Sequence, residues 1–379
     1  MRSVTMVKII HIVRGNFSPY SLNGVYKVVD SISCELGNMM GVENVCVCSV
    51  SPKHSEDIYV PEKYQHVQFR EHPLKFFLCK DFRHFLLSQP KDTIFHFHSV
   101  FIPWFFPAVR LLKKIGYQRV VLTPHGQYVD EAMRRSLKKR IFFHFFDRQV
   151  IKLVDAVQVI GHTEINHYIT SNAREYHLIP NGGPSCHTIT SLLERPLVFG
   201  YLGRMEIAQK GLDVLLRAFA FYLKQGGKGI LQIGGAGIGK ENLMRLCQEM
   251  EISSSVCFRD KVFGEDKQRF LQECAWFVHP SRWDVLPTAC LEAASCGVPL
   301  IVSRETNLDM YLKKYDAGIV MASDDRPIQA LATCFFATEK IFENPPRYAE
   351  YCGQTQKMLQ EELNWQHIAS MDVKWLYKL

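Results

Sequence analysis

The chain has 379 residues, of which 47% are hydrophobic and 22% are charged. This composition is typical of a globular protein and excludes a disordered or fibrous one, and the length predicts two domains because a domain usually holds roughly 100 to 200 residues. The formal charge of +7 indicates a mild preference for anionic partners, but charge alone does not choose among nucleotides, lipid surfaces and nucleic acid.

The first apolar run, from Val7 to Val13, is followed by Arg14 and Gly15 rather than by a small-residue cleavage site. It therefore predicts a first strand and not a signal peptide. No later stretch reaches the roughly 18 apolar residues of a membrane-spanning helix. The twelve cysteines are scattered without a CxxC pair, which favours reduced thiols and a cytoplasmic protein.

Short β-branched or aromatic runs alternate with helical patterns along the chain, which predicts parallel sheets covered by helices on both faces. The turn-rich stretch 179–184, followed by polar residues to Glu194, predicts a boundary between two Rossmann-like domains, 1–185 and 186–364. We expect ligands in a cleft between them, at the carboxyl ends of the strands. The expected strands are 7–13, 44–50, 66–70, 93–99, 119–123 and 156–160, then 197–203, 229–234, 255–262, 275–280, 298–303 and 318–322.

The strand 197–203 leads into a loop that carries Gly203, Arg204 and Lys210 before a helix begins. Two cations on a glycine-flanked loop suit a diphosphate that develops charge as its sugar leaves. The alternative for this loop is an ordinary solvated basic turn.

The strand 275–280 leads into a loop with Asp284 and Leu286, and then into a short helix that we expect to begin at Pro287. The free amides of its first turn, around Thr288, would form an anion site. Glu292 lies about one and a half turns inside this helix, so the two carboxylates can meet different parts of one ligand. A capping Asp and a solvent-facing Glu are the alternative.

Together these motifs resemble the donor site of glycosyltransferase family 4. The resemblance rests on Gly203-Arg204 with Lys210-Gly211 and on Asp284-x7-Glu292 followed by Ala-Ala-x-Cys-Gly-Val-Pro-Leu-Ile, and it extends to 123–126 and 179–182. It implies a GT-B fold and a retaining transfer from a nucleotide-diphosphate sugar without a metal cofactor. It also implies an acceptor-binding first domain, a donor-binding second domain and a terminal helix, 365–379, that packs back on the first.

By this resemblance Arg204 and Lys210 hold the diphosphate, Glu292 binds the ribose hydroxyls and Asp284 contacts the donor sugar. We count Gly203, Leu286 and Thr288 among the donor-binding residues, and Val262 ends a segment, 258–262, that would line the base. The family usually has Glu at the position of Asp284. The shorter side chain must lie closer to the sugar or reach it through water, which leaves the identity of the sugar open.

In the first domain, Asn23 and Gly24 resemble the family's glycine loop near the donor phosphates, with Asn23 standing in for a glycine because Asn tolerates left-handed backbone. The matching family histidine implies that His125 contacts the donor. His96 and His98 share one strand face, but no acidic or Cys partner completes a metal site, so we predict no zinc and assign His98 to the acceptor site.

The segment 131–153 carries seven Lys or Arg residues against two acids, with four phenylalanines among them. We expect one helix that either rests on an anionic membrane, where a lipid-linked acceptor would lie, or packs with a solvated basic face. The expected acceptor is a glycan of bacterial surface polysaccharide synthesis, such as O-antigen, capsule or lipopolysaccharide, and no nucleic acid partner is expected.

Two other classes of protein fit parts of the sequence. The run Gly234 to Lys240 resembles the phosphate-binding loop of a nucleoside triphosphatase, but Glu241 replaces the Ser or Thr that would hold magnesium. A non-catalytic, membrane-docking protein that binds sugar nucleotides would keep the basic segment. The sequence does not identify the sugar, the base or the acceptor.

Overall fold

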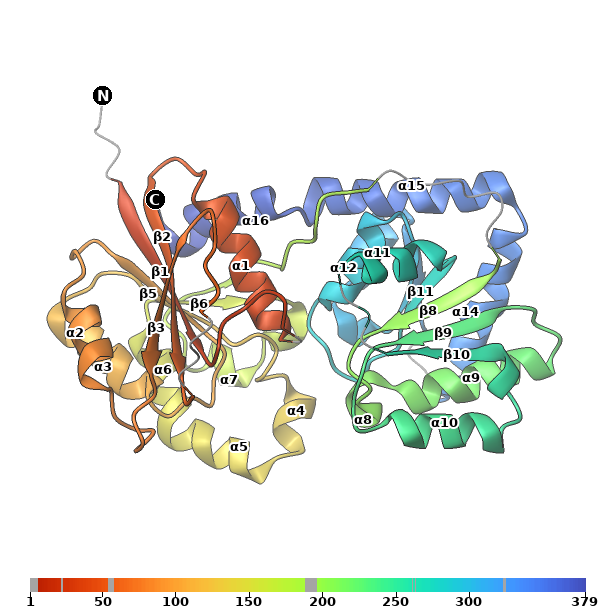
Figure 1. Cartoon of the computed structure of the whole chain (residues 1–379), viewed down its shortest axis with the longest axis horizontal. Coiled ribbons are helices and arrows are strands. Elements are labelled where there is room, and N and C mark those ends of the chain that lie inside the picture. The colour runs from red at the N-terminus through yellow and green to blue at the C-terminus, as the bar shows by residue number, and fades with distance from the viewer. Residues whose placement is uncertain are drawn as a thin grey trace. The chain divides into compact units, whose positions relative to one another are not determined.

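The computed structural model describes residues 6–21, 23–53, 58–187, 196–260, 262, 264–322 and 325–379. The chain divides into two compact units: Met1–Asn181 together with Trp365–Leu379 form unit 1, and Gly182–Asn364 form unit 2. Each unit contains one parallel sheet with helices packed on it (Figure 1). The predicted fold class, two doubly wound α/β sheets, is confirmed.

The sheet of unit 1 has seven strands in the order β3-β2-β1-β4-β5-β6-β7, and all of its pairs are parallel. Its strands are β1 (Val7–Arg14), β2 (Val42–Ser51), β3 (Gln65–Arg70), β4 (Ile94–His98), β5 (Val120–Thr123), β6 (Ala156–Val159) and β7 (Tyr176–Leu178). Its helices are α1 (Gly24–Leu36), α2 (Lys80–Leu87), α3 (Phe105–Ile115), α4 (Asp130–Arg134), α5 (Leu137–Phe142), η1 (Phe143–Asp147), α6 (Arg148–Leu153), η2 (His162–Glu164), α7 (His167–Thr170), α16 (Trp365–Met371) and η5 (Asp372–Tyr377).

Alternate residues of the strands supply two separate cores, one on each face of the sheet. On β1, Ile9 packs in a cluster with α1 and α16, whereas the next residue, Ile10, packs in a cluster with α3. This is the alternation that a strand buried on both faces requires. The central strands of unit 1 are therefore near-continuous apolar runs, which is why the sequence located them well.

Residues 365–379 complete one face of unit 1. The Tyr377 hydroxyl lies 2.8 Å from Nδ1 of His96 on β4, and Arg119 donates from Nε to the carbonyl oxygen of Leu376 at 2.8 Å. These polar contacts and the apolar side chains of α16 join the end of the chain to this sheet.

Unit 2 has six parallel strands in the order β10-β9-β8-β11-β12-β13. Its strands are β8 (Val198–Leu202), β9 (Ile230–Gly234), β10 (Val256–Arg259), β11 (Trp276–His279), β12 (Leu300–Val302) and β13 (Gly318–Val320). Its helices are α8 (Ile207–Lys210), α9 (Leu212–Lys224), α10 (Lys240–Glu249), η3 (Ser253–Ser255), α11 (Gly264–Glu273), α12 (Thr288–Ser295), η4 (Arg304–Thr306), α13 (Asp309–Tyr315), α14 (Pro327–Phe342) and α15 (Pro345–Glu362).

One predicted element was wrong and one strand was missed. The segment 131–153 is not one helix, because Ser136 adopts an extended backbone and caps α5, its hydroxyl accepting from the Lys139 amide at 3.3 Å. Ser is favoured at the N-cap of a helix and disfavoured in its interior, so Ser136 separates α4 from α5. The short edge strand β7 was missed because its three residues form no apolar run.

The strand order reverses between β1 and β4 in unit 1 and between β8 and β11 in unit 2. Loops that leave adjacent strands at such a point diverge and leave room for a ligand. Among the residues with described structure, no helix is both long and apolar enough to cross a membrane.

Candidate active site

The loops that follow β8 and β11 bring two of the predicted residues into direct contact. Lys210, the last residue of α8, is buried, and its Nζ forms an ion pair with Oδ2 of Asp284. Gly211 follows in left-handed backbone with φ of 66°, and a Cβ at this position would lie 2.2 Å from the carbonyl oxygen of Pro280. Only glycine permits this approach, and it is what brings Lys210 to the end of β11.

Asp284 is held from several directions. Its Oδ2 also lies 3.0 Å from Nε2 of His279 and accepts from Ser281 Oγ at 3.4 Å, while Oδ1 accepts from the Val285 amide at 3.1 Å. Burial by itself would raise the pKa of Asp284, but the Lys210 charge and the His279 hydrogen bond outweigh it and lower the pKa below its usual value. The carboxylate is therefore ionised and fixed in orientation.

The loop between Asp284 and α12 is held by backbone contacts. Leu286 is buried with φ of 47°, a conformation that non-glycine residues seldom adopt, and its amide donates to the carbonyl oxygen of Thr306 at 3.0 Å. Pro287 is the N-cap of α12, so Thr288 rather than Pro287 is the first helical residue. The prediction was one residue early, within the usual uncertainty of helix ends.

Arg204 and Glu292 lie at different parts of this region. The Arg204 side chain is 59% exposed; its Nη1 lies 3.3 Å from Oε2 of Glu206, and its Nη2 donates to Gln209 Oε1 at 3.3 Å. Gln209 donates in turn to the carbonyl oxygen of Trp283 at 3.2 Å, which links the loops after β8 and β11. Glu292 lies on α12, and its Oε1 is 2.7 Å from Nζ of Lys267 on α11.

Two further residues predicted for the donor site lie at the end of β8 and near β10. The Gly203 amide donates to the carbonyl oxygen of Gly234 at 3.1 Å, which joins the ends of β8 and β9. Val262 is nearly buried, and its neighbours Lys261 and Phe263 lie outside the described residues. The roles predicted for all the donor-site residues stay predictions.

The glycine-rich loop after β9 packs against protein backbone. A Cβ on Gly237 would lie 2.8 Å from the Met205 amide nitrogen, and a Cβ on Gly239 would lie 2.6 Å from the Met205 carbonyl oxygen. Lys240 Nζ lies 2.5 Å from Oδ2 of Asp260. Close backbone packing therefore explains these glycines without a triphosphate, which argues against the nucleoside triphosphatase.

The structure corrects the reason given for Asn23. Its φ is −82°, not left-handed, and its side chain caps α1 by accepting from the Val25 amide at 3.0 Å. Asn is among the best N-cap residues, which accounts for its presence here. A Cβ on Gly24 would meet nothing within 4 Å, so the described structure gives no steric reason for this glycine.

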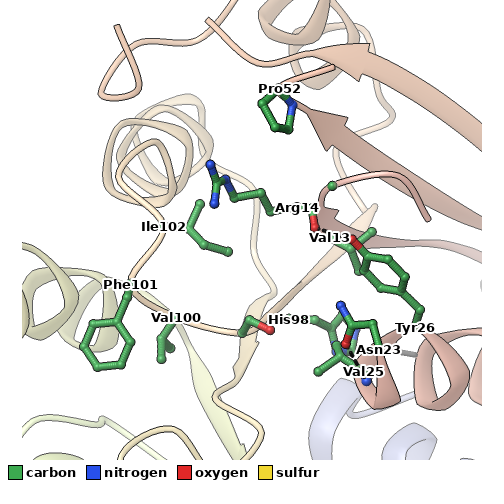
Figure 2. Close-up of a pocket in the computed structure, with 12 residues that line it drawn as sticks. Val13, Arg14, Asn23, Val25, Tyr26, Pro52, His98, Val100, Phe101 and Ile102 are labelled. Carbon is green, nitrogen blue, oxygen red and sulfur yellow. Dashed lines mark hydrogen bonds between the residues drawn. The ribbon is translucent and has the colours of Figure 1, made fainter. Parts of the chain in front are cut away.

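A pocket of about 270 Å³ opens at the strand-order reversal of unit 1 (Figure 2). Arg14 enters it from β1, held by Glu71, which accepts from Nε at 2.7 Å and from Nη2 at 3.1 Å. Asn23, His98 and the apolar side chains of Val100 and Ile102 also line it. The pocket thus offers both hydrogen-bonding and apolar surface.

His125 follows β5 and belongs to a cluster of histidines that was not predicted from the sequence. Its Nε2 lies 3.0 Å from Nδ1 of His98, and Nε2 of His98 lies 2.8 Å from Nδ1 of His11 on β1. Burial lowers the pKa of both His11 and His125 to about 3, and burial together with neighbouring histidines lowers the pKa of His96 and His98 well below the usual value. All four rings are therefore neutral near pH 7.

His11, His96 and His98 are the one group of potential metal ligands found within the described structure, with ligand atoms within 4.8 Å of one another. The third member, His11, was missed because it comes from another strand. However, Nδ1 and Nε2 of His96 contact Tyr377 and Thr123, and Nε2 of His98 contacts His11. Metal binding would break these contacts, so the cluster is better described as a hydrogen-bonded network.

Three residues that touch the predicted site were not identified from the sequence. His279 is the last residue of β11, and a strand-end histidine at the predicted cleft was a usable signal. Ser281 and Lys267 had none, because their relation to Asp284 and Glu292 depends on how the chain folds.

Comparison with known proteins agrees with the motifs. A model of the group 1 glycosyl transferases matches residues 188–352, and a model of glycosyltransferase family 4 matches residues 22–183. The uncharacterized glycosyltransferase MJ1607 of Methanocaldococcus jannaschii is 24% identical over 179 residues, which are 47% of this chain and 44% of that protein. The match thus spans less than half the length of this relative.

Solved structures resemble the chain along nearly its whole length. Sucrose-phosphate synthase from Thermosynechococcus elongatus has a TM-score of 0.74 at 16% identity, covering 97% of each chain. The lipopolysaccharide outer core galactosyltransferase WaaB has a TM-score of 0.68 at 16% identity, covering 98% of this chain and 100% of its own. Anabaena Alr3699/HepE in complex with UDP and glucose has a TM-score of 0.69 at 13% identity, covering 98% and 99%. The two family models match residues 22–183 and 188–352, so the protein belongs to glycosyltransferase family 4, and its fold is the GT-B architecture.

Proposed function

We propose that the protein is a retaining glycosyltransferase that moves a sugar from a nucleotide-diphosphate sugar to a glycan acceptor. The observation that carries this proposal is the buried Lys210, fixed by Asp284 where the strand order of unit 2 reverses. A buried, oriented cation at a ligand-binding edge suits a developing phosphate charge.

In the proposed reaction the bond between the anomeric carbon and the diphosphate oxygen breaks. The acceptor oxygen bonds to that carbon on the same face, and the acceptor proton passes to the departing phosphate oxygen. Lys210, Arg204 and the start of α12 at Thr288 stabilise the leaving nucleoside diphosphate. The two cations and the helix start support a reaction without a metal cofactor.

The carboxylates have separate proposed roles. Asp284 contacts the donor sugar and also keeps Lys210 in position, since one of its oxygens already accepts from the ammonium group. Glu292 binds the ribose hydroxyls of the nucleotide. His125 contacts the donor sugar and its phosphate region.

For the substrates we propose a UDP or GDP sugar as donor and a lipid-linked glycan of bacterial surface polysaccharide as acceptor. The complex of Alr3699/HepE with UDP and glucose supports the donor, and the role of WaaB in the lipopolysaccharide outer core supports the acceptor. We assign the acceptor to the pocket lined by Arg14 and His98, whose mixed polar and apolar surface suits a sugar.

A surface on unit 1, which we call the basic apolar face, supports peripheral binding to an anionic membrane. Leu137, Ile141 and Phe145 follow one another at four-residue intervals and are 66%, 50% and 64% exposed. A neighbouring loop adds further exposed apolar side chains, and the rings of Phe76 and Phe146 lie 4.8 Å apart. The exposed cations along α4 and α5 include Arg134, Arg135, Lys138 and Arg140. Apolar side chains with cations around them match the boundary between lipid headgroups and acyl chains.

Vesicle sedimentation tests the membrane proposal. The protein should sediment with vesicles of phosphatidylglycerol and phosphatidylcholine but not with phosphatidylcholine alone, and Leu137→Ser with Phe145→Ser should abolish this. Met40→Ser, which removes an exposed apolar side chain elsewhere in unit 1, is the control. Equal sedimentation of the double variant and wild type would show that another surface binds lipid.

A panel of UDP, GDP and ADP sugars tests the proposed function. One donor should raise the melting temperature and be hydrolysed or transferred in the presence of EDTA, with the anomeric configuration retained in the product. Hydrolysis of ATP that requires magnesium, with no response to any sugar nucleotide, would contradict the proposal.

A further inference from the structure

A chain of three histidine side chains leads from the core of unit 1 to His125. His11 lies on β1, His98 ends β4 and His125 follows β5, and two hydrogen bonds of 2.8 and 3.0 Å connect the three rings. His11 and His98 are at most 2% exposed. Which ring donates in each of these hydrogen bonds depends on the tautomer of each histidine.

The protons on these three linked histidine rings can be placed in only two consistent ways. A neutral imidazole carries one N–H and one acceptor nitrogen, so each ring between two others must donate to one and accept from the other. Either every ring donates toward His125, or every ring donates toward His11. The choice decides which nitrogen of His125 carries its proton.

The surroundings of His11, the most buried of the three rings, favour one of these two arrangements. Nε2 of His11 is buried and has no hydrogen-bond partner in the part of the chain that the structure describes. If the rings donated toward His11, an N–H would be left unpaired in the core, and an orphaned buried N–H is rarer than an acceptor left without a donor. His11 Nδ1–H therefore donates to His98 Nε2, and His98 Nδ1–H donates to Nε2 of His125.

The backbone of the His125 loop is fixed as well. His125 and Gly126 have φ of 54° and 76°, so two consecutive residues are left-handed. The Gly126 amide donates to Oε1 of the buried Glu164 at 2.5 Å, and Oε2 accepts from the Ile160 amide at 2.7 Å. A strained loop held at both side chain and backbone is typical of a residue whose orientation matters.

We propose that His11 and His98 are positioning residues that hold His125 as the Nδ1–H tautomer, so that His125 presents a neutral hydrogen-bond donor to a substrate oxygen. This rests on the proposed role of His125 at the donor sugar. The substrate group that His125 recognises is an oxygen that accepts a hydrogen bond, either a sugar hydroxyl or a phosphate oxygen.

Nitrogen-15 NMR of the histidine side chains tests the tautomer without any catalysis. In wild type the His125 ring, assigned by the loss of its signals in His125→Gln, should carry its proton on Nδ1. In His11→Leu, which removes the donor at the start of the chain, His125 should become Nε2–H or a mixture. An Nε2–H tautomer in wild type would overturn the proposal.

Kinetics of two His11 variants separate positioning from a merely structural role. His11→Leu should lower kcat about tenfold, the equivalent of one hydrogen bond, with the affinity for the nucleotide unchanged. His11→Asn, whose amide can replace Nδ1–H, should retain kcat within about threefold. Equal kcat values for the two variants would contradict the proposal.

The two measurements also distinguish this proposal from the proposed function. An Nδ1–H tautomer in a protein that transfers no sugar would contradict the function alone. An Nε2–H tautomer in an active transferase would contradict the histidine chain alone.

Discussion

Replacing Lys210 by Met should cause separate losses in catalysis and in stability. The Lys210 and Asp284 side chains are only 10% and 15% exposed, so each relies on the other for charge compensation. Removing one partner of a buried pair costs about 3 kcal/mol or more, because the other charge stays buried. Loss of a preorganised donor to the leaving phosphate should independently lower kcat/KM by about 10²- to 10³-fold.

The double variant Lys210→Met with Asp284→Asn separates these two effects. It has no unpaired buried charge, so urea unfolding should show that it recovers most of the stability lost by Lys210→Met. It still lacks the cation and also lacks the Asp284 carboxylate, so its kcat/KM, measured with the donor found in the sugar-nucleotide panel, should be at least as low as that of the single variant. Recovery of turnover together with stability would refute the role of Lys210 at the leaving group.

Lys113→Met is a matched control for the lysine substitution. Lys113 pairs with Asp155 in unit 1 at 2.8 Å, and the two side chains are 21% and 16% exposed, so it is also a partly buried lysine paired with a carboxylate, although it is more exposed than Lys210. The control should lose stability and keep kcat/KM within about threefold of wild type. A comparable loss of turnover in the control would mean that general destabilisation explains the Lys210 result.

Three further predictions concern pH, nucleotide binding and backbone strain. The pKa of His11 is about 3 in the folded protein against 6.5 as the ordinary value, so its contribution to stability is fully present above pH 6.5 and is lost as the pH falls toward 3. Wild type should therefore lose about 2 kcal/mol relative to His11→Asn between pH 7.5 and pH 5 in urea unfolding, and a pH-independent difference would contradict the burial of a neutral ring. Glu292→Gln should weaken binding of the nucleoside diphosphate about tenfold by calorimetry, and unchanged affinity would exclude it from the ribose site. Gly211→Ala should destabilise by more than about 2 kcal/mol, since the new Cβ meets the Pro280 carbonyl, whereas Gly116→Ala, with φ of 95° and no atom within 4 Å, should cost only the backbone strain of about 1 kcal/mol.

The sequence located most of the fold because its signals are local. Strands buried on both faces of a parallel sheet are continuous runs of β-branched and aromatic residues, and these runs can be recognised without knowing their neighbours. The loops with Arg204, Lys210 and Asp284 were found for the same reason, since each follows such a run. The family resemblance added roles for these residues that spacing alone does not supply.

Only the tertiary structure decided which of these residues meet. Lys210 and Asp284 are 74 positions apart and touch because β8 and β11 are neighbours in the sheet. His11, His98 and His125 meet because β1, β4 and β5 are neighbours in the sheet, although β2 and β3 lie between β1 and β4 in the sequence. Strand order and register are set by packing over the whole unit, so no local pattern encodes them. The sequence by itself therefore located the loops to which we assign the chemistry, and the folded sheets determined which of their side chains meet.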